Sequence, residues 1–363
     1  MTTDYDAILL VSFGGPEQED DVIPFMERVT AGRGIPRERL EEVSQHYFQF
    51  GGRSPINDQN RQFKAALEQL LAIEGPDLPV YWGNRNWHPL LADTLREMRD
   101  DGVQRALCFV TSAYSSYSGC RQYREDLAAA RTEVGEGAPT LDKIRVYYNH
   151  PGFVAPQITI IERALRQLPD DVRDDAVLVF TTHSIPWTMS RHSDYEVQHY
   201  ETCRLVAASF PGRPWQLVFN SRSGPEHVPW LEPDVNDHLE ELAGRGVRAV
   251  VVVPIGFVSD HMEVIYDLDV EAAETAERLG LAFVRADTVG TNEAFVRGVR
   301  DLIRERVDGS EPAALGTRGP NWDVCPVDCC FTPGQEARPT VAQAAPRSRP
   351  AGTPSEHRGT AAD

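Results

Sequence analysis

The sequence predicts an α/β protein of two similar doubly wound lobes, each built on a parallel sheet. Apolar runs of strand length alternate with longer helical patterns, which is typical of parallel strands buried on both faces. The alternation comes in two sets, with a hinge predicted at Asn149-His150-Pro151-Gly152. The expected strands cover residues 7–12, 80–83, 106–111 and 143–147, then 176–182, 215–220, 249–255 and 282–286. The expected helices cover residues 61–74, 90–101, 120–133, 153–167, 197–209 and 234–245.

The length of 363 residues is enough for two domains that each bury a core. We expect a first lobe over residues 1–149, a second lobe over 150–308 and a cysteine-containing extension over 309–331. Residues 332–363 are rich in Pro, Ala, Gly, Ser and Thr and almost lack large apolar side chains. Such a segment buries too little surface to offset its ordering entropy, so it is predicted to be disordered.

Charge and hydropathy narrow the class of protein. The 36 basic and 55 acidic residues give a formal charge of −19, which disfavours nucleic acid as a partner. Residues 1–13 lack the basic start of a signal peptide, and no apolar run approaches the ~18 residues that span a bilayer. We therefore expect a cytoplasmic monomer without a transmembrane segment; peripheral membrane contact stays open.

The stretch 249–271 is the most informative about function. A β-branched apolar run ends at Pro254-Ile255-Gly256, and Glu263, Asp267 and Glu271 follow at a spacing that places three carboxylates on one helix face. This row is either a solvated face or a path for a cation. Asp260 and His261 beside Glu263 favour the second interpretation, because carboxylate and imidazole ligands at a strand end suit a divalent metal.

His183 ends another apolar run of the second lobe and precedes Ser-Ile-Pro. In one parallel sheet, His183 and Glu263 would lie at the same edge. Imidazole titrates near ~6.5, so His183 could accept a proton or bind a metal. The alternative is a histidine that only caps backbone groups at the strand end.

The first lobe supplies candidate ligand-binding loops. Gly14-Gly15-Pro16 follows the first strand but lacks the G-x-G-x-x-G spacing, and Pro16 removes an N–H donor, which argues against a nucleotide. Residues 50–57 and 111–123 provide hydroxyls, aromatic rings and glycines near strand ends. These side chains suit a flat, mostly apolar ligand with polar substituents, although each aromatic ring could instead belong to the core.

The six cysteines form two groups. Cys108, Cys120 and Cys203 occur singly and are expected to be buried or inert. Cys325, Cys329 and Cys330 cluster near the end of the globular sequence, which indicates a metal or iron–sulfur site more than disulfides. Three thiolates are one short of a full set of four.

Several motifs, taken together, resemble those of the ferrochelatases, which insert ferrous iron into a porphyrin. The resemblance runs from Tyr5 to Val307. Its motifs are Ser-Phe-Gly-Gly-Pro at 12–16, Gly-Gly-Arg-Ser-Pro-Ile at 51–56, Tyr-Trp-Gly-Asn-Arg-Asn at 81–86, Thr-His-Ser-Ile-Pro at 182–186, Ser-Arg-Ser-Gly-Pro at 221–225, Pro-Trp-Leu-Glu-Pro-Asp at 229–234 and Pro-Ile-Gly-Phe-Val-Ser-Asp-His-Met-Glu-Val at 254–264.

The resemblance implies a porphyrin cleft between the lobes and assigns roles to particular residues. His183 and Glu263 match the family's central metal-site residues, and Asp267 and Glu271 match carboxylates that deliver metal or remove protons. Ser54 and Tyr123 match porphyrin contacts. Phe13 also falls on the porphyrin-facing motif, but relatives that carry tyrosine there can offer an oxygen to the metal, which Phe13 lacks.

The substrates implied by the resemblance are Fe²⁺ and a porphyrin. The segment from Gly51 to Arg61 resembles bacterial enzymes that use coproporphyrin III, and an acidic chain without an apolar lip suits that tetracarboxylate. The alternatives are a protoporphyrin IX ferrochelatase, a metal chelatase for another tetrapyrrole, and a haem or iron carrier without turnover.

The cysteine extension is similar to one that holds a [2Fe–2S] cluster in some ferrochelatases. Four thiolates are the usual requirement. The fourth would come from Cys120 or Cys203, and zinc or no metal at all are the alternatives.

Overall fold

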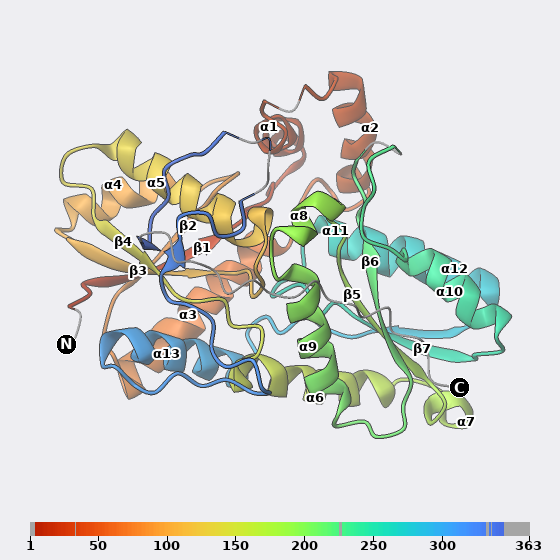
Figure 1. Cartoon of the computed structure of the whole chain (residues 1–363). Helices are drawn as coiled ribbons and strands as arrows, with labels where there is room; N and C mark the ends of the chain where they lie inside the picture. Colours follow the sequence, from red (N-terminus) through yellow and green to blue (C-terminus); the bar gives the residue numbers. More distant parts are fainter. Residues whose placement is uncertain (1–3, 33, 225–226, 332–333, 335, 345–363) are drawn as a thin grey trace.

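The computed structural model describes residues 4–32, 34–224, 227–331, 334 and 336–344. It contains two α/β lobes, each with a four-stranded parallel sheet (Figure 1). The predicted fold class is therefore confirmed. Within these described residues, no helix is both long and apolar enough to cross a bilayer.

The first lobe has the strand order β2-β1-β3-β4 and helices on both faces of the sheet. The six residues of β1 are all buried, as expected for a central parallel strand. The strands are β1 (Ala7–Ser12), β2 (Val80–Asn84), β3 (Arg105–Val110) and β4 (Thr140–Lys143). The helices are α1 (Glu19–Val29), α2 (Arg37–Phe48), α3 (Ile56–Glu74), α4 (Leu91–Asp100), the π-helix η1 (Tyr117–Arg121) and α5 (Gln122–Val134).

The second lobe repeats this topology with the strand order β6-β5-β7-β8. Its strands are β5 (Val177–His183), β6 (Trp215–Asn220), β7 (Ala249–Val253) and β8 (Ala282–Arg285). Its helices are α6 (Pro151–Leu165), α7 (Asp170–Arg173), α8 (Trp187–Arg191), α9 (Tyr195–Ala207), α10 (Val235–Gly244), α11 (Met262–Val264), the π-helix η2 (Ile265–Glu271), α12 (Ala272–Leu279) and α13 (Glu293–Val307). In each sheet the strand order reverses between the first and third strands of the lobe, which is where open α/β sheets bind ligands.

The two lobes share one large hydrophobic core. The ring of Phe295 on α13 lies 5.6 Å from that of Phe63 on α3 and 6.0 Å from that of Phe153 on α6, measured between centroids. Figure 1 shows α13 and α6 running along the lower side of the molecule. The predicted boundary at residue 150 thus separates the two sheets but not their core, and the division into domains stays a prediction.

Two predicted elements are placed differently in the structure. The fourth strand covers Thr140–Lys143 instead of residues 143–147. Ile144 and Tyr147 are buried in the shared core. The apolar run of residues 143–147 therefore reflects burial of its side chains and not hydrogen bonding within the sheet. Asp267 and Glu271 of the expected acidic helix face lie in the π-helix η2, and Glu263 lies in α11 immediately before it. A π-helix has i→i+5 hydrogen bonds and often marks a functional site.

Part of the segment predicted to be disordered packs against the first lobe. The short strand β10 (Gln343–Ala344) pairs with β9 (Cys325–Pro326). Val341 is buried beside Leu127 of α5, and the Arg124 guanidinium donates hydrogen bonds to the carbonyl oxygens of Val341 at 3.0 Å and Ala342 at 3.3 Å. The expected disorder is therefore wrong for this stretch, because its contacts with the helix surface offset the entropy lost on ordering. Residues 345–363 lie outside the described residues.

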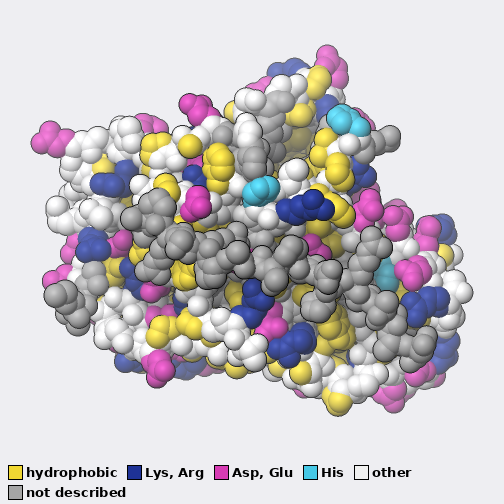
Figure 2. All heavy atoms as spheres, in the orientation of Figure 1, with side chains coloured by type: hydrophobic (Ala, Val, Ile, Leu, Met, Phe, Trp, Pro, Cys, Tyr) yellow, Lys and Arg dark blue, Asp and Glu magenta, His cyan; other side chains and the backbone are white. Residues whose placement is uncertain are grey.

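The surface reflects the excess of acidic residues. On the face shown in Figure 2, Asp and Glu side chains gather on the second-lobe side, whereas Lys and Arg side chains lie scattered. Among the described side chains on this face, the basic ones form no extended patch that would suit a phosphate backbone.

Candidate active site

His183 and Glu263 meet at the carboxyl edge of the second sheet, with His183 Nε2 3.7 Å from Glu263 Oε2. His183 is the last residue of β5, and Glu263 lies in α11, which follows β7. Strands β5 and β7 are neighbours and flank the point where the strand order reverses. The structure thus brings together, at a ligand-binding position of the fold, the two residues that the sequence placed in one site.

The ring proton of His183 can be assigned from its contacts. Nδ1 lies 2.5 Å from the carbonyl oxygen of Ser184, and because a carbonyl only accepts, Nδ1 is the protonated nitrogen. Nε2 therefore presents its lone pair toward Glu263. The side chains of His183 and Glu263 are 31% and 53% exposed, so both can be reached from solvent. A lone pair facing a carboxylate suits a shared proton or a metal cation.

The carboxylates of η2 continue from Glu263 as a row. Asp267 accepts hydrogen bonds from Asn220 Nδ2 at 3.0 Å and from the Ser221 hydroxyl. Burial, and then the negative charge of Glu263, raise the pKa of Asp267 to about 6. Burial and the charge of Asp267 likewise raise the pKa of Glu271. The pKa values of Asp267 and Glu271 are therefore each raised in part by the preceding carboxylate, and the value of about 6 brings the titration of Asp267 close to neutral pH.

Side chains of the first lobe contact the segment that carries these carboxylates. The His46 ring of α2 stacks on the Tyr266 ring of η2, with centroids 3.7 Å apart and planes 7° apart. The backbone N–H of Asp260 donates to Gln59 Oε1 at 2.8 Å, and its carboxylate lies 3.1 Å from Arg285. Asp260 was a candidate metal ligand only because it precedes Glu263 closely in the sequence. In the structure it joins the two lobes and pairs with an arginine.

Tyr47 is a residue of this site that the sequence analysis missed. Burial, and then the charges of Glu263 and Asp267, raise the pKa of the Tyr47 hydroxyl, which places that hydroxyl near both carboxylates. Phe13 is half-buried in the same apolar cluster. Helix α2 was not predicted, although Tyr47 stands only a few residues before the Gly-Gly-Arg-Ser-Pro motif, which was the one available signal.

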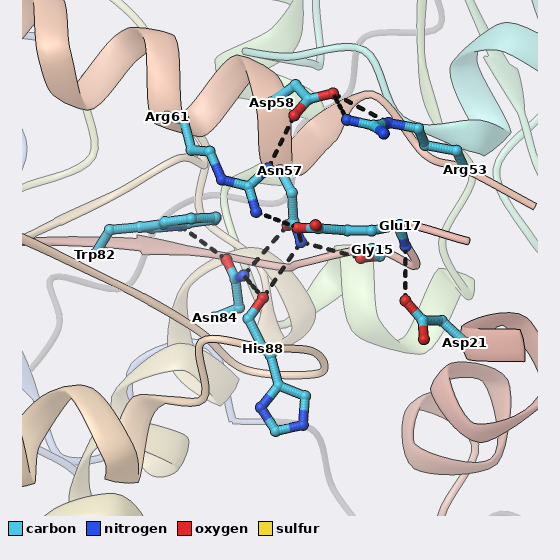
Figure 3. A network of polar contacts seen from close by, with 10 residues as sticks. All are labelled: Gly15, Glu17, Asp21, Arg53, Asn57, Asp58, Arg61, Trp82, Asn84 and His88. Carbon is cyan, nitrogen blue, oxygen red and sulfur yellow. Dashed lines mark hydrogen bonds and ion pairs between the residues drawn. The ribbon is translucent and has the colours of Figure 1, made fainter.

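The turn after β1 is filled by protein side chains (Figure 3). Asn57 Nδ2 donates to the Gly15 carbonyl oxygen at 3.1 Å and to Glu17 Oε1 at 2.8 Å. Gly14 has φ +80°, and a Cβ there would come within 2.8 Å of Asn84 Cβ. Gly14 therefore packs closely on Asn84, and Gly15 offers its carbonyl oxygen to Asn57, so both glycines make close contacts within the protein.

Ser54 and Tyr123 are buried, with 3% and 5% of their surface exposed. Ser54 packs against Gly15, where a Cβ would come within 2.8 Å of Ser54 Cβ. Tyr123 belongs to the first-lobe core beneath the Arg85 guanidinium, which lies 4.7 Å from its ring centroid. Neither residue contacts His183 or Glu263 directly, so their assignment as porphyrin contacts stays a prediction.

Four of the six cysteines come together. Cys329 Sγ lies 3.7 Å from Cys330 Sγ, and Cys120 and Cys325 are close enough that each shifts the pKa of the other's thiol. A cavity of about 280 Å³ borders all four. Cys203 is instead buried within α9. In the part of the chain that the structure describes, no three His, Cys, Asp or Glu side chains are already arranged to hold a metal ion.

Two doubly wound lobes, with a histidine–carboxylate pair where the strand order of the second sheet reverses, define an α/β protein with a candidate site for proton or metal-ion chemistry. A solved structure titled "SirB from Bacillus subtilis with Fe3+" has this fold, with a TM-score of 0.55, 11% sequence identity and coverage of 85% of this chain and 97% of that one. At that identity the likeness concerns the fold alone.

Sequence comparisons are more specific. The ferrochelatase family profile matches residues 5–307. The coproporphyrin III ferrochelatase of Streptomyces coelicolor is 56% identical and covers 94% of this chain and 96% of its own length. The ferrochelatase of Rhodopirellula baltica is 52% identical over 94% of this chain and 97% of its own. The coproporphyrin III ferrochelatase of Nocardia farcinica is 52% identical over 93% and 99%, respectively. This chain belongs to the ferrochelatase family and is a ferrochelatase enzyme.

Proposed function

We propose that this enzyme inserts ferrous iron into coproporphyrin III and releases the two pyrrole protons. The observation that carries the proposal is the approach of His183 Nε2 to Glu263 Oε2 at the switch point of the second sheet. The preference for coproporphyrin III is supported by the names of the relatives from Streptomyces coelicolor and Nocardia farcinica, whose sequences match nearly the whole chain.

Iron insertion requires two N–H bonds of the porphyrin to break. The lone pair on His183 Nε2 is available either to accept a pyrrole proton or to hold the incoming iron. Glu263 supplies a carboxylate oxygen on the other side of the same gap. A full protein ligand set is unnecessary here, because the porphyrin itself provides four nitrogens to the iron.

Asp267 and Glu271 are proposed as the path for protons and metal beside this pair. The pKa of Asp267, about 6, lets that carboxyl accept a proton from the site and release it again near neutral pH. Ionised carboxylates also bind hard divalent cations through oxygen, as delivery of Fe²⁺ requires.

The first lobe is proposed to hold the porphyrin. Phe13 lies in one cluster with Phe25 and Trp87, which offers apolar surface next to Tyr47. Phe13 has no oxygen for a metal, so we assign it to ring packing. Ser54 and Tyr123 remain proposed porphyrin contacts on the family pattern, and their burial means that local movement would have to accompany binding.

Steady-state kinetics with the two porphyrins tests the substrate. We expect kcat/KM to be higher for coproporphyrin III than for protoporphyrin IX. A clear advantage for protoporphyrin IX would overturn the preference, and faster insertion of cobalt or nickel into another tetrapyrrole would favour that kind of chelatase.

Single-turnover mixing separates the enzyme from a carrier. The protein, free coproporphyrin III and Fe²⁺ are mixed without oxygen, and the Soret band is followed in time. We expect metallated porphyrin to form faster than in the same mixture without protein. An equal rate with and without protein would mean that the chain only carries haem or iron.

We also propose a [2Fe–2S] cluster held by Cys325, Cys329, Cys330 and, as the fourth ligand, Cys120. The choice of Cys120 over Cys203 is supported by the cavity that Cys120 lines together with Cys325, Cys329 and Cys330. The neighbouring Cys325 thiol and burial raise the pKa of Cys120, so the free thiol is neutral, and metal binding would have to displace its proton. Four thiols from one helix and one loop fit the ligand number of such a cluster.

A further inference from the structure

Two residues of α9 face the strand end that carries His183. The Tyr195 hydroxyl donates to the main-chain carbonyl oxygen of His183 at 2.8 Å and lies 2.7 Å from Thr182 Oγ1. His199, one turn further along α9, has Nε2 2.9 Å from the same Thr182 hydroxyl. Tyr195, His199 and Thr182 are all buried, and His199 and Thr182 are 0% and 1% exposed.

The hydrogen atoms in this network can be assigned. His199 Nδ1 lies 2.7 Å from the carbonyl oxygen of Tyr195, so Nδ1 donates and Nε2 is the acceptor. The Thr182 hydroxyl therefore donates to His199, so the single Tyr195 proton is shared in a three-centre bond between Thr182 Oγ1 and the His183 carbonyl oxygen. Burial lowers the pKa of His199 to about 3, in agreement with a neutral ring. Every hydrogen of the network is thereby placed, and the Tyr195 proton links Thr182 to the His183 peptide.

The network also lies between β5, which carries His183, and the turn after β7, which leads to Glu263. A Cβ on Gly256 would come within 2.1 Å of Thr182 Oγ1, so the turn that leads from β7 toward Glu263 packs directly on the Thr182 side chain. On the other side, the Tyr114 ring stacks on His199 with centroids 3.5 Å apart, and the Tyr114 hydroxyl donates to the Ile255 carbonyl oxygen at 3.0 Å. Thr182 thus contacts both chain segments that carry the pair.

We propose that Tyr195 and His199 are positioning residues for iron insertion: through Thr182 they fix the peptide of His183, and so the distance from its Nε2 to Glu263. The inference rests on the proposed role of the His183–Glu263 pair. None of the three residues touches the reacting atoms. Their effect comes from geometry, because a catalytic group displaced by about 1 Å can lose on the order of a hundred-fold in rate.

Tyr195→Phe removes one hydroxyl and keeps the buried ring. We expect kcat to fall about ten-fold, while KM for the porphyrin changes less than about two-fold, because the ring is held elsewhere. Tyr200→Phe is the matched control: the same change on the same helix, at a side chain that is 43% exposed. It should leave kcat unchanged.

Thr182 provides a second pair of variants that does not depend on how Tyr195→Phe folds. Thr182→Val has nearly the same shape without the hydroxyl and should lower kcat as Tyr195→Phe does. Thr182→Ser keeps the hydroxyl and should restore most of the rate. The double variant Tyr195→Phe with Thr182→Val should be little worse than either single one, since both break the same chain of bonds.

The inference is overturned if Tyr195→Phe keeps the wild-type kcat, or if Thr182→Ser is as slow as Thr182→Val. His183→Ala, measured in parallel, separates this failure from a failure of the proposed function. Full activity in His183→Ala would refute the role of the pair itself. An inactive His183→Ala beside a fully active Tyr195→Phe would refute only the positioning network.

Discussion

Arg124 Nε donates to the carbonyl oxygen of Val341 at 3.0 Å, which ties a first-lobe helix to the segment beyond the cysteines. The same guanidinium also bonds to Thr340 Oγ1 at 3.1 Å. Arg124 is only 1% exposed, so removing it would leave buried oxygens without a donor.

Arg124→Met should therefore lower the free energy of unfolding by about 2–4 kcal/mol, measured by denaturant unfolding. Arg96→Met is the control, because Arg96 is 39% exposed and forms ion pairs with Asp93 and Glu133 at the surface. Such exposed pairs are screened by solvent and contribute little to stability. Equal effects of the two changes would show that the tail does not depend on Arg124.

If the four neighbouring thiols hold the proposed [2Fe–2S] cluster, we expect the purified protein to be coloured. Serine in place of Cys120, Cys325, Cys329 or Cys330 should each bleach the visible absorption of the anaerobically purified protein and release its iron and sulfide. Cys203→Ser, at a cysteine buried in α9, should leave the colour intact. A colourless wild-type protein would refute the cluster, and bleaching by Cys203→Ser but not by Cys120→Ser would refute the choice of fourth ligand.

Asp267→Asn should act mainly on the use of iron. The variant keeps an oxygen that can accept from Asn220 but loses the negative charge, so KM for Fe²⁺ should rise several-fold and kcat should fall less. The measurement is the initial rate against Fe²⁺ concentration at saturating porphyrin. Glu277→Gln, an exposed change on α12, is the control, and identical iron dependence in the two variants would rule out a metal path at Asp267.

We predict that protonation of His150 causes part of the loss of folding stability in acid. Burial lowers its pKa to about 4, against 6.5 in the unfolded chain, so the folded protein binds fewer protons between these values. The stability contributed by the neutral ring is complete above pH 6.5 and is lost as the pH falls toward 4, by about 1.4 kcal/mol per pH unit.

His150→Asn keeps an acceptor for the Gly152 N–H at the start of α6 and removes the titration. We expect unfolding curves at pH 7.5 close to those of the wild type, and a variant that is the more stable protein at pH 5. Parallel pH dependence of the two proteins would contradict the assignment.

The sequence predicted most of what depends on local pattern. Runs such as Ala249–Val253 form buried strands because β-branched residues suit a parallel sheet, and His183 and Glu263 follow from their places at strand ends. The sequence left the fourth cysteine open between Cys120 and Cys203, because only the folded arrangement brings Cys120 to the same cavity as the other three. Tyr195 and His199 were missed for the same reason, since no spacing shows that they bond to Thr182.

The central claim is that the His183–Glu263 pair performs iron insertion. The most direct test is anaerobic single-turnover insertion into bound coproporphyrin III by the wild type, His183→Ala and Glu263→Gln, with porphyrin binding measured separately by fluorescence. We expect both variants to bind porphyrin much as the wild type does and to insert iron at least about a hundred-fold more slowly. A near-normal insertion rate in Glu263→Gln would contradict the claim and reduce the acidic row to a solvated face.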